Sequence, residues 1–461
     1  MSSTTETAKA EPKPALLRLA PLLTVCAAVV VLGSRFFLVI AKHSVNFFWW
    51  DQWDYLGAFF RGNPGIVELF TWQHGPHREG VGLLLDKFLF PLTRWNTRVD
   101  AFVIGVCVFA AMVLALMLKH KLFGTISYCD VAIPALFFTL AQCEKIVADP
   151  NPAYAGFPLL LIMLYCHALL QRNLLLRYLL VLALNFLLIY TGFGVFMGPV
   201  TIGVFILECT RSIRRVSDVS WPLPFAALII SALSLASFFV HYKFWPAVNC
   251  FRFPYHPLWH YPWFVAIMFS RFVIGAKGIA LATLVGIPIA AIVVVLAAVY
   301  FWRVLRHKAG VEAMIQFVLL TYTLLFSVDC AIGRVCLGLP EAAQAARYVS
   351  LMIPAFLALY FWLFRLKLGS KRTITLTAFA VISLVASSNR PALLHWYTQT
   401  KTTWAACFLQ TQNVQACDQL VGISIYPSDG VGAATFQQKL EFLKDHHLSF
   451  FAGAAESDRK Q

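Results

Sequence analysis

Charged residues are scarce in this chain: Asp, Glu, Lys and Arg together make up 13% of its 461 residues. Soluble domains carry about 25% charged and 45–50% apolar residues, whereas 59% of this chain is hydrophobic. These values exclude an ordinary water-soluble protein. Acidic residues are the rarer sign, with 22 against 37 basic residues and a net charge of +15. In so apolar a chain, a basic surplus is more typical of membrane topology and anionic lipid than of nucleic acid, so we expect no nucleic-acid partner.

The eleven cysteines contain no paired CxxC motif, which excludes the usual zinc-binding spacings. Most of them fall in apolar runs, where cysteine packs as a small apolar residue. Cys407 and Cys417 lie outside those runs, and either they or Cys330 and Cys336 could form a disulfide in an oxidising compartment. The sequence also shows no internal repeat, so it lacks the signature of many transporters.

Long apolar runs are abundant, and each run of about 20 residues is long enough to cross a membrane as a helix. The sequence predicts eleven crossings, at residues 15–40, 99–118, 129–147, 156–171, 174–191, 193–209, 222–240, 279–302, 311–328, 348–366 and 373–388. The apolar run Tyr261–Lys277 contains Arg271, and we expect a helix lying at the outer interface there. The expected fold class is an all-α integral membrane protein with about 11 transmembrane helices.

Basic residues cluster in every second connection between the predicted spans. The clusters are Lys119/Lys121, Arg172/Arg177, Arg211/Arg214/Arg215, Arg303/Arg306/Lys308 and Arg365/Lys367/Lys371/Arg372. Because Lys and Arg concentrate in cytoplasmic loops, we expect a cytoplasmic N-terminus and a periplasmic C-terminus in a bacterial inner membrane. The expected organisation is a disordered segment 1–14, a membrane domain 15–388 with a long first outer loop 42–98, and a small outer tail 389–461.

The first outer loop opens with an aromatic and acidic run, Phe47-Phe48-Trp49-Trp50-Asp51-Gln52-Trp53-Asp54-Tyr55. Asp51 and Asp54 are three residues apart, so they share one face of a helix. Bulky aromatic neighbours would desolvate these carboxylates and raise a pKa toward that of a useful general base. The alternative is that Asp51 caps the helix and Asp54 is solvated in its first turn.

A second polar cluster follows at His74-Gly75-Pro76-His77-Arg78-Glu79. Gly-Pro prevents a continuous helix, so the two histidines are presented from a turn. Three interpretations remain open. His74, His77 and Glu79 could bind a divalent metal ion, Arg78 with the histidine pair could hold a phosphate or pyrophosphate, or the turn is structural with a solvated Arg78–Glu79 pair.

Other outer residues suit sugars or lipid headgroups. Trp50, Trp53 and Trp245 are candidates for stacking on a sugar face, although an aromatic belt at the membrane interface explains such residues equally well. Arg347 and Tyr348 open the tenth predicted span, where Arg347 could clamp a lipid phosphate. Snorkelling toward headgroups is the alternative for this pair.

Five short motifs carry a resemblance to a known superfamily: Trp50-Asp51-Gln52-Trp53-Asp54, His74-Gly75-Pro76-His77-Arg78, Thr93-Arg94-Trp95-Asn96, Ile332-Gly333-Arg334 and Ala346-Arg347-Tyr348. With the long first outer loop, they make the chain similar to the GT-C membrane glycosyltransferases. Protein O-mannosyltransferases and lipid A aminoarabinose transferases belong to this superfamily, and the motifs look most like a poorly characterised group of bacterial multi-pass proteins. The chain lacks the mannosyltransferases' Asp-Glu pair and a long soluble C-terminal domain.

The resemblance implies a glycosyltransferase that moves a sugar from a polyprenyl-phosphate donor to a glycan or lipid acceptor, with inversion. Asp51 or Asp54 would be the general base. Arg78, Arg334 and Arg347 would stabilise charge on the donor phosphate. No cofactor is certain, and a divalent metal ion stays open.

Two other classes of function compete with an enzyme. One is a transporter or flippase of a lipid-linked or anionic solute, which would need polar residues buried at mid-span. Few are present: Arg35 and Glu208 lie near span ends, and Asn185 is uncharged. The other is a non-catalytic envelope assembly protein, which would need neither first-loop carboxylate.

Overall fold

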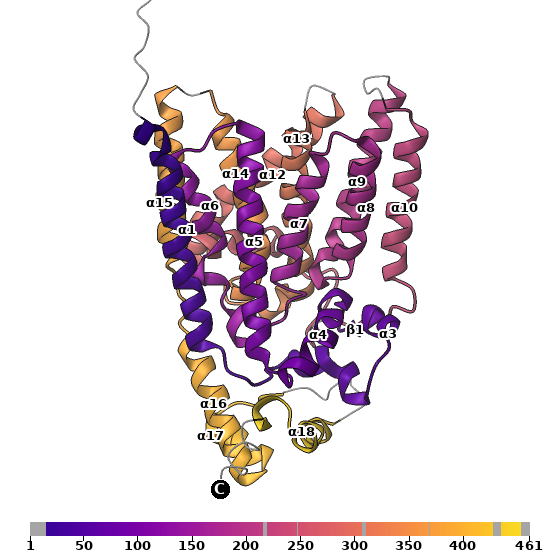
Figure 1. Ribbon diagram of the computed structural model, residues 1–461, viewed down its shortest axis with the longest axis vertical. Helices are drawn as coiled ribbons and strands as arrows, with labels where there is room; N and C mark the ends of the chain where they lie inside the picture. Colours follow the sequence, from indigo (N-terminus) through magenta and orange to yellow (C-terminus); the bar gives the residue numbers. More distant parts are fainter. Residues whose placement is uncertain are drawn as a thin grey trace, which may run out of the picture.

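The computed structural model describes residues 15–214, 219–246, 248–306, 310–367, 369–426 and 435–452. The N-terminal segment 1–14, expected to be disordered, lies outside the described residues. Within them the protein is a bundle of helices that run up and down along one axis (Figure 1). The one strand pair among the described residues is β1 (Gln73–His74) with β2 (His77–Arg78).

Six helices of the described residues are long and apolar enough to cross a membrane. They are α1 (Ala15–His43), α5 (Thr97–Phe123), α9 (Met197–Ile213) with the turn before it, α12 (Ile279–Leu305), α13 (Val311–Arg334) and α14 (Val349–Arg365). Shorter apolar helices are α6 (Ala132–Phe137) with its flanking turns, α7 (Gly156–Leu169), α8 (Leu174–Ile189) and α10 (Pro222–Phe238). These helices confirm an all-α membrane protein.

The remaining helices complete the bundle and cover one end of it. They are α2 (Gln52–Tyr55), α3 (Ile66–Thr71), α4 (Gly80–Thr93), α11 (His260–Ile274), α15 (Ser370–Ser387), α16 (Leu394–Thr411), α17 (Val414–Val421) and α18 (Phe436–Asp445). Local signals set several helix ends. Asn96 caps α5 by accepting a hydrogen bond from the Arg98 N–H, and Gly124 ends α5 in the left-handed conformation.

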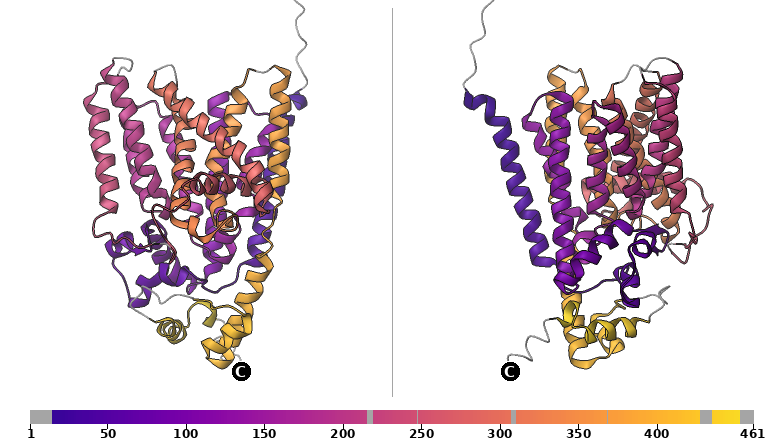
Figure 2. Two further views of the ribbon diagram at one scale, coloured as in Figure 1. Left: turned by 180° about the vertical axis from the view of Figure 1, so that it is seen from behind. Right: turned by 45° about the vertical axis from the view of Figure 1, so that its right-hand side comes forward.

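The apolar run that contains Arg271 forms the separate helix α11. In the view from behind, this helix runs across the long helices instead of along them (Figure 2). It packs closely on α12, because a Cβ added at Gly286 would lie 2.0 Å from the Ala266 carbonyl oxygen. Glycine at this position therefore permits the backbones of α11 and α12 to approach each other. Arg271 itself is 8% exposed.

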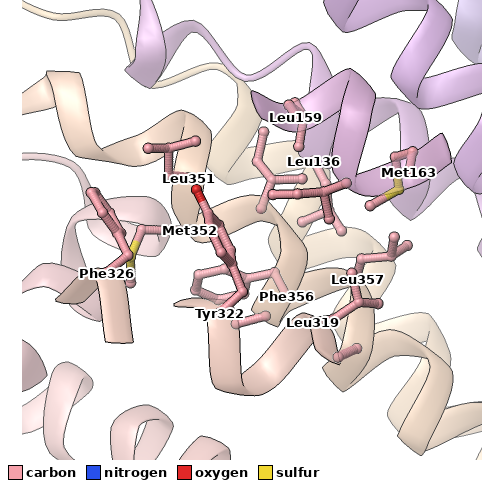
Figure 3. Packing of buried hydrophobic residues seen from close by; sticks show 14 of the residues in the cluster. Leu136, Leu159, Met163, Leu319, Tyr322, Phe326, Leu351, Met352, Phe356 and Leu357 are labelled. Atoms are coloured by element: carbon pink, nitrogen blue, oxygen red, sulfur yellow. The ribbon is translucent and has the colours of Figure 1, made fainter. Parts of the chain in front are cut away.

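The main core lies between the long helices and takes apolar side chains from most of them, including α1, α5, α6, α7, α9, α11, α12, α13 and α14. Figure 3 shows Tyr322 and Phe326 of α13 packed near Leu351 and Met352 of α14, with Leu159 of α7 beside them. Interiors of this kind are close-packed, so these side chains hold the helices in a defined arrangement.

Two disulfides lie in the described part of the chain. Cys407–Cys417 joins α16 to α17, as one of the two pairs considered from the sequence. Cys336, in contrast, is bonded to Cys250 and not to Cys330. The reason is that Cys330 lies within α13 and is buried in the main core, whereas Cys336 follows the end of that helix. The Cys250–Cys336 bond ties the connection between α10 and α11 to the end of α13.

We expect peptide mapping without reduction to recover Cys250 linked to Cys336 and Cys407 linked to Cys417. Replacing Cys250 by serine should release an alkylatable thiol at Cys336 and leave the Cys407–Cys417 peptide unchanged, because the two bonds lie in different segments. A linked peptide of Cys330 and Cys336 would contradict the pairing described above.

Candidate functional site

The first outer loop shares a small core with the C-terminal tail, at one end of the bundle (Figure 1). The core is aromatic, and Trp53 lies inside it between Phe48 and Phe436, with ring centroids 5.2 and 4.9 Å away. Trp53 has no exposed surface. It therefore cannot stack on a sugar, which corrects the role that its sequence context suggested. Its indole instead holds the loop and tail together.

The chain turns sharply just before Asp51. Trp50 adopts a left-handed backbone with φ of 45°, which is unfavourable for a non-glycine residue. Asp51 then occupies the N-cap position of α2 but makes no capping hydrogen bond. The side chain of Gln52 stabilises this turn instead. It accepts a hydrogen bond from the Trp49 N–H and donates one to the Pro150 carbonyl oxygen. The Asp51 carboxylate is thus free of the helix that it begins, and its side chain is 56% exposed.

Asp54 is fastened to the tail. Its Oδ1 accepts hydrogen bonds from the Tyr426 hydroxyl at 2.5 Å and from Lys439 Nζ at 3.2 Å. Lys439 is 1% exposed and also donates to the Trp53 carbonyl oxygen. Asp54 is therefore not simply solvated in the first helical turn. Of the two acids, Asp51 is the one whose carboxylate has no hydrogen-bond donor among the described residues.

The turn between β1 and β2 presents the two histidines, with Gly75 in the left-handed region at φ 54°. His74 Nδ1 lies 3.0 Å from Glu79 Oε1, and the other carboxylate oxygen of Glu79 accepts from Asn151 Nδ2 at 2.7 Å. Burial alone would lower the pKa of His74, but the hydrogen bond and the charge of Glu79 outweigh it and raise this pKa to about 9. His74 is therefore an imidazolium cation near neutral pH.

The metal interpretation of this turn is not supported. Both carboxylate oxygens of Glu79 are already engaged, one by His74 and the other by Asn151. The pKa of His77 lies well below its usual value, first because the residue is buried and second because Arg334 is positively charged. The His77 ring packs against Tyr154 and Phe193. In the described part of the chain, no group of three or more His, Cys, Asp or Glu residues could hold a metal ion, so His74, His77 and Glu79 do not form such a set.

Arg78 has a structural role. Its guanidinium donates to the carbonyl oxygens of Thr71 and Val240, each at 2.5 Å, and the residue is 4% exposed. These bonds join β2 to the residues that follow α10. Because its donors point to backbone carbonyls, Arg78 is not available for the phosphate role that the sequence suggested.

Cations surround Asp51. Lys145, on the short helical turn Glu144–Ala148, lies 3.8 Å from Asp51 Oδ2 and forms a buried ion pair with Asp149. Burial alone would raise the pKa of Asp51, but Lys145, His74, Arg347 and Arg334 more than offset this effect and lower it. The expectation that aromatic neighbours would raise this pKa is therefore wrong, because cations dominate the site.

Asp51 and Asp54 open into a polar cavity of about 260 Å³ on the first-loop end of the bundle. Its lining includes Asp51, Asp54, Gln73, His74, His77, Tyr154, Trp245, Asn249 and Arg334. The sequence brought the acids, both histidines, Trp245 and Arg334 under consideration, and these lie together. It gave no signal for Tyr154 or Asn249, since neither belongs to a motif. Lys145 and Asp149 belong to no motif either.

An apolar groove of about 320 Å³ shares a wall with this cavity. Its lining comes from α9, α10 and the outer end of α13, and includes Val195, Phe196, Leu235, Phe238, Phe239, Phe251 and Ile332. The residues common to cavity and groove are Pro76, His77, Trp245, Pro246 and Arg334. Trp245 is 46% exposed at this junction. A polar cavity beside an apolar groove suits a ligand with a charged head and an apolar chain.

Three further candidates lie outside the lining of both spaces. Trp50 is 41% exposed and stacks on Trp49, with ring centroids 6.2 Å apart. Arg347 is held by Glu144, with its guanidinium 3.7 Å from a carboxylate oxygen. Tyr348 is buried, and the guanidinium of Arg334 lies 5.8 Å from its ring. Arg347 thus acts on Asp51 through its charge. Tyr348 presents its ring to the guanidinium of Arg334.

No known protein family, curated protein or solved structure matches this chain in the comparisons.

The His74–Glu79 pair predicts a pH-dependent contribution to stability. A pKa raised from 6.5 to about 9 adds stability below about pH 6.5 that is lost as the pH rises through 9. This change in pKa corresponds to a stabilisation on the order of 2–3 kcal/mol. The value allows for some screening by solvent, because the side chain of His74 is 14% exposed. We expect the melting-temperature difference between wild type and His74→Gln to be largest near pH 6.5 and to shrink by about pH 9.5.

The matched control is His446→Gln, on the exposed end of α18. This histidine has no carboxylate partner among the described ion pairs, so its variant should track the wild type across the same pH range. A difference between wild type and His74→Gln that stays constant with pH would show that folding does not shift the pKa of His74.

Proposed function

We propose that this protein is a membrane glycosyltransferase of the GT-C type that transfers a sugar from a polyprenyl-phosphate donor to a glycan or lipid acceptor. The observation that carries the proposal is the ionised Asp51 in a polar cavity that shares a wall with an apolar groove. An ionised carboxylate can accept a proton, and the two adjoining spaces fit the two halves of a lipid-linked sugar.

The donor would lie across the shared wall. Its isoprenoid chain suits the groove between α9, α10 and α13, where most of the lining is apolar. Its phosphate would then lie near Arg334, which lines both spaces, with the imidazolium of His74 on the polar side. These cations would stabilise the negative charge that develops on the leaving phosphate. Trp245, exposed at the junction, offers a ring face to the sugar.

In the proposed reaction, Asp51 accepts the proton of the acceptor hydroxyl as its oxygen bonds to the anomeric carbon. The bond from that carbon to the phosphate oxygen breaks, and its electron pair leaves with the phosphate. Attack opposite the leaving group inverts the anomeric centre. Lys145 would keep Asp51 ionised and orient it, while Asp54 would hold the tail in place and define the cavity's outer wall.

We also propose eleven membrane crossings, formed by α1, α5, α6 with its flanking turns, α7 to α10 and α12 to α15, with α11 not crossing. The order and bounds of these helices support this count. Each basic cluster has a described member at the helix ends opposite the first loop, which favours a cytoplasmic location for that end; these members are Lys119, Arg172, Arg211, Arg303 and Arg365. Both disulfides belong to the other end and suit a periplasmic compartment.

The test of the reaction is Asp51→Asn in the full-length protein, compared with wild type by mass spectrometry of co-purifying lipid. We expect a polyprenyl-phosphate sugar to accumulate in the variant, because the donor binds but transfer lacks its base. Transfer should fall by roughly 100-fold or more, the usual contribution of a general base. The matched control is Glu68→Gln, which removes an exposed carboxylate of the same loop outside the cavity lining; it should behave as wild type.

Two results would overturn this assignment. Full transfer activity in Asp51→Asn would show that Asp51 is not the general base, whichever donor the protein uses. Bulk phospholipid alone in both proteins, with no lipid-linked sugar, would instead favour the transporter or envelope-assembly alternatives.

The topology has its own test by cysteine labelling in intact cells. Gly310→Cys lies at the cluster-bearing end, in open space with φ of −72°, so the new side chain is tolerated. Gln415→Cys lies on the exposed surface of α17 at the other end. We expect a membrane-impermeant maleimide to label Gln415→Cys and not Gly310→Cys, above the background of the wild-type thiols. Labelling of Gly310→Cys alone would invert the topology.

A further inference from the structure

A second polar cavity lies at the end of the bundle opposite the first loop. It has a volume of about 190 Å³ and is enclosed by the ends of α7, α8, α9 and α13. Its lining consists of Leu169, Arg177, Tyr178, Val181, Phe205, Glu208, Arg211, Val311 and Met314. None of these residues lines the cavity around Asp51 or the apolar groove beside it. The two polar sites are thus separate.

The charges in this cavity do not balance. Two arginines, Arg177 and Arg211, face a single carboxylate, that of Glu208. Glu208 and Arg211 are i,i+3 neighbours on α9 with an N–O distance of 3.7 Å, which is longer than a charge-assisted hydrogen bond. Within the described residues, Arg211 Nε is buried without a hydrogen-bond partner. The cavity therefore holds an excess positive charge and unused donors.

Tyr178 adds an independent observation. The residue is 4% exposed, and its hydroxyl makes no hydrogen bond of normal geometry in the part of the chain that the structure describes, although the guanidinium of Arg177 lies beside it. The hydroxyl belongs to a residue that lines the cavity, and the guanidinium of Arg177 lies 5.5 Å from its ring. A ligand that accepts hydrogen bonds would satisfy Tyr178 and Arg211 together.

We propose that this cavity binds a phosphate group, held by Arg177, Arg211 and the hydroxyl of Tyr178. A phosphate brings negative charge and several acceptor oxygens, and guanidinium groups match its geometry with paired N–H donors. The small volume admits a phosphate but not a large headgroup. The phosphate belongs to a phospholipid headgroup or to free phosphate, and this site is independent of the glycosyltransferase proposal.

The test uses full-length, delipidated protein in neutral detergent and native mass spectrometry. The probes are dioctanoyl phosphatidic acid, inorganic phosphate, and dioctanoylglycerol, which has the same chains without the phosphate. We expect one phosphatidic acid per chain, with affinity weakened roughly tenfold or more in Arg177→Gln and Arg211→Gln. Tyr178→Phe, which keeps the ring and its packing, should weaken binding by a smaller factor.

Two control variants complete the design. Glu208→Gln removes a negative charge beside the ligand, so it should bind phosphatidic acid at least as tightly as wild type. Arg372→Gln removes an exposed arginine of the same bundle end that lies outside the cavity lining, and it should have no effect. Competition by inorganic phosphate at similar concentration would identify free phosphate as the ligand, and preference for the lipid would identify the headgroup.

The proposal fails if Arg177→Gln and Arg211→Gln bind phosphatidic acid as well as Arg372→Gln does. It also fails if dioctanoylglycerol binds as tightly as phosphatidic acid, because the phosphate would then contribute nothing. Tyr178→Phe protects the test against misfolding of the arginine variants: unchanged binding by a folded Tyr178→Phe would remove its hydroxyl from the site.

Discussion

The constraint on which the rest of the structure depends is that an apolar membrane offers no hydrogen-bond partners to a polypeptide backbone. Helices satisfy the hydrogen-bonding groups of their own backbone, so the apolar runs of this chain form helices. Most of the charged groups then lie at the two ends of the bundle. The consequence is a protein with two polar faces and an apolar middle. At one face the first outer loop folds on the tail through a shared aromatic core that contains Trp53. That core gives Asp51 a rigid support although it lies in a loop.

Charge compensation then decides the chemistry of the site. Lys145 serves two carboxylates, Asp51 in the cavity and the buried Asp149, whose pKa burial raises to about 7 even with Lys145 beside it. On the other side, Glu79 holds His74 as a cation. The cavity therefore contains a carboxylate bounded by positive charge, an arrangement that suits an anionic substrate placed next to a proton acceptor. Without Glu79 and Asp149, burial would favour neutral forms of His74 and Lys145.

The sequence was sufficient to predict the class of fold, because hydrophobic runs and basic clusters report directly on membrane helices. It also identified most residues of the candidate site, since Asp51, His74 and Arg334 stand in compact polar motifs. The sequence could not predict which residues contact each other across long distances in the chain. The pairing of Cys250 with Cys336 and of Asp54 with Lys439 joins residues far apart in the chain, and no local pattern encodes such contacts. The direction of the Asp51 pKa was wrong for the same reason: adjacent aromatics are visible in the sequence, whereas the distant cation Lys145 is not.

The lowered pKa of Asp51 bears on how a base could work here. A carboxylate with a low pKa is ionised but accepts a proton weakly. Under the proposed function, a donor phosphate beside Arg334 and His74 would neutralise much of the positive field that Asp51 experiences. The same phosphate would repel the carboxylate, and both effects raise its pKa. Asp51 would thus become a stronger base when the donor is bound, and proton abstraction would be coupled to the presence of the sugar. The cations that lower the pKa of Asp51 are, in this arrangement, the groups through which the donor would activate it.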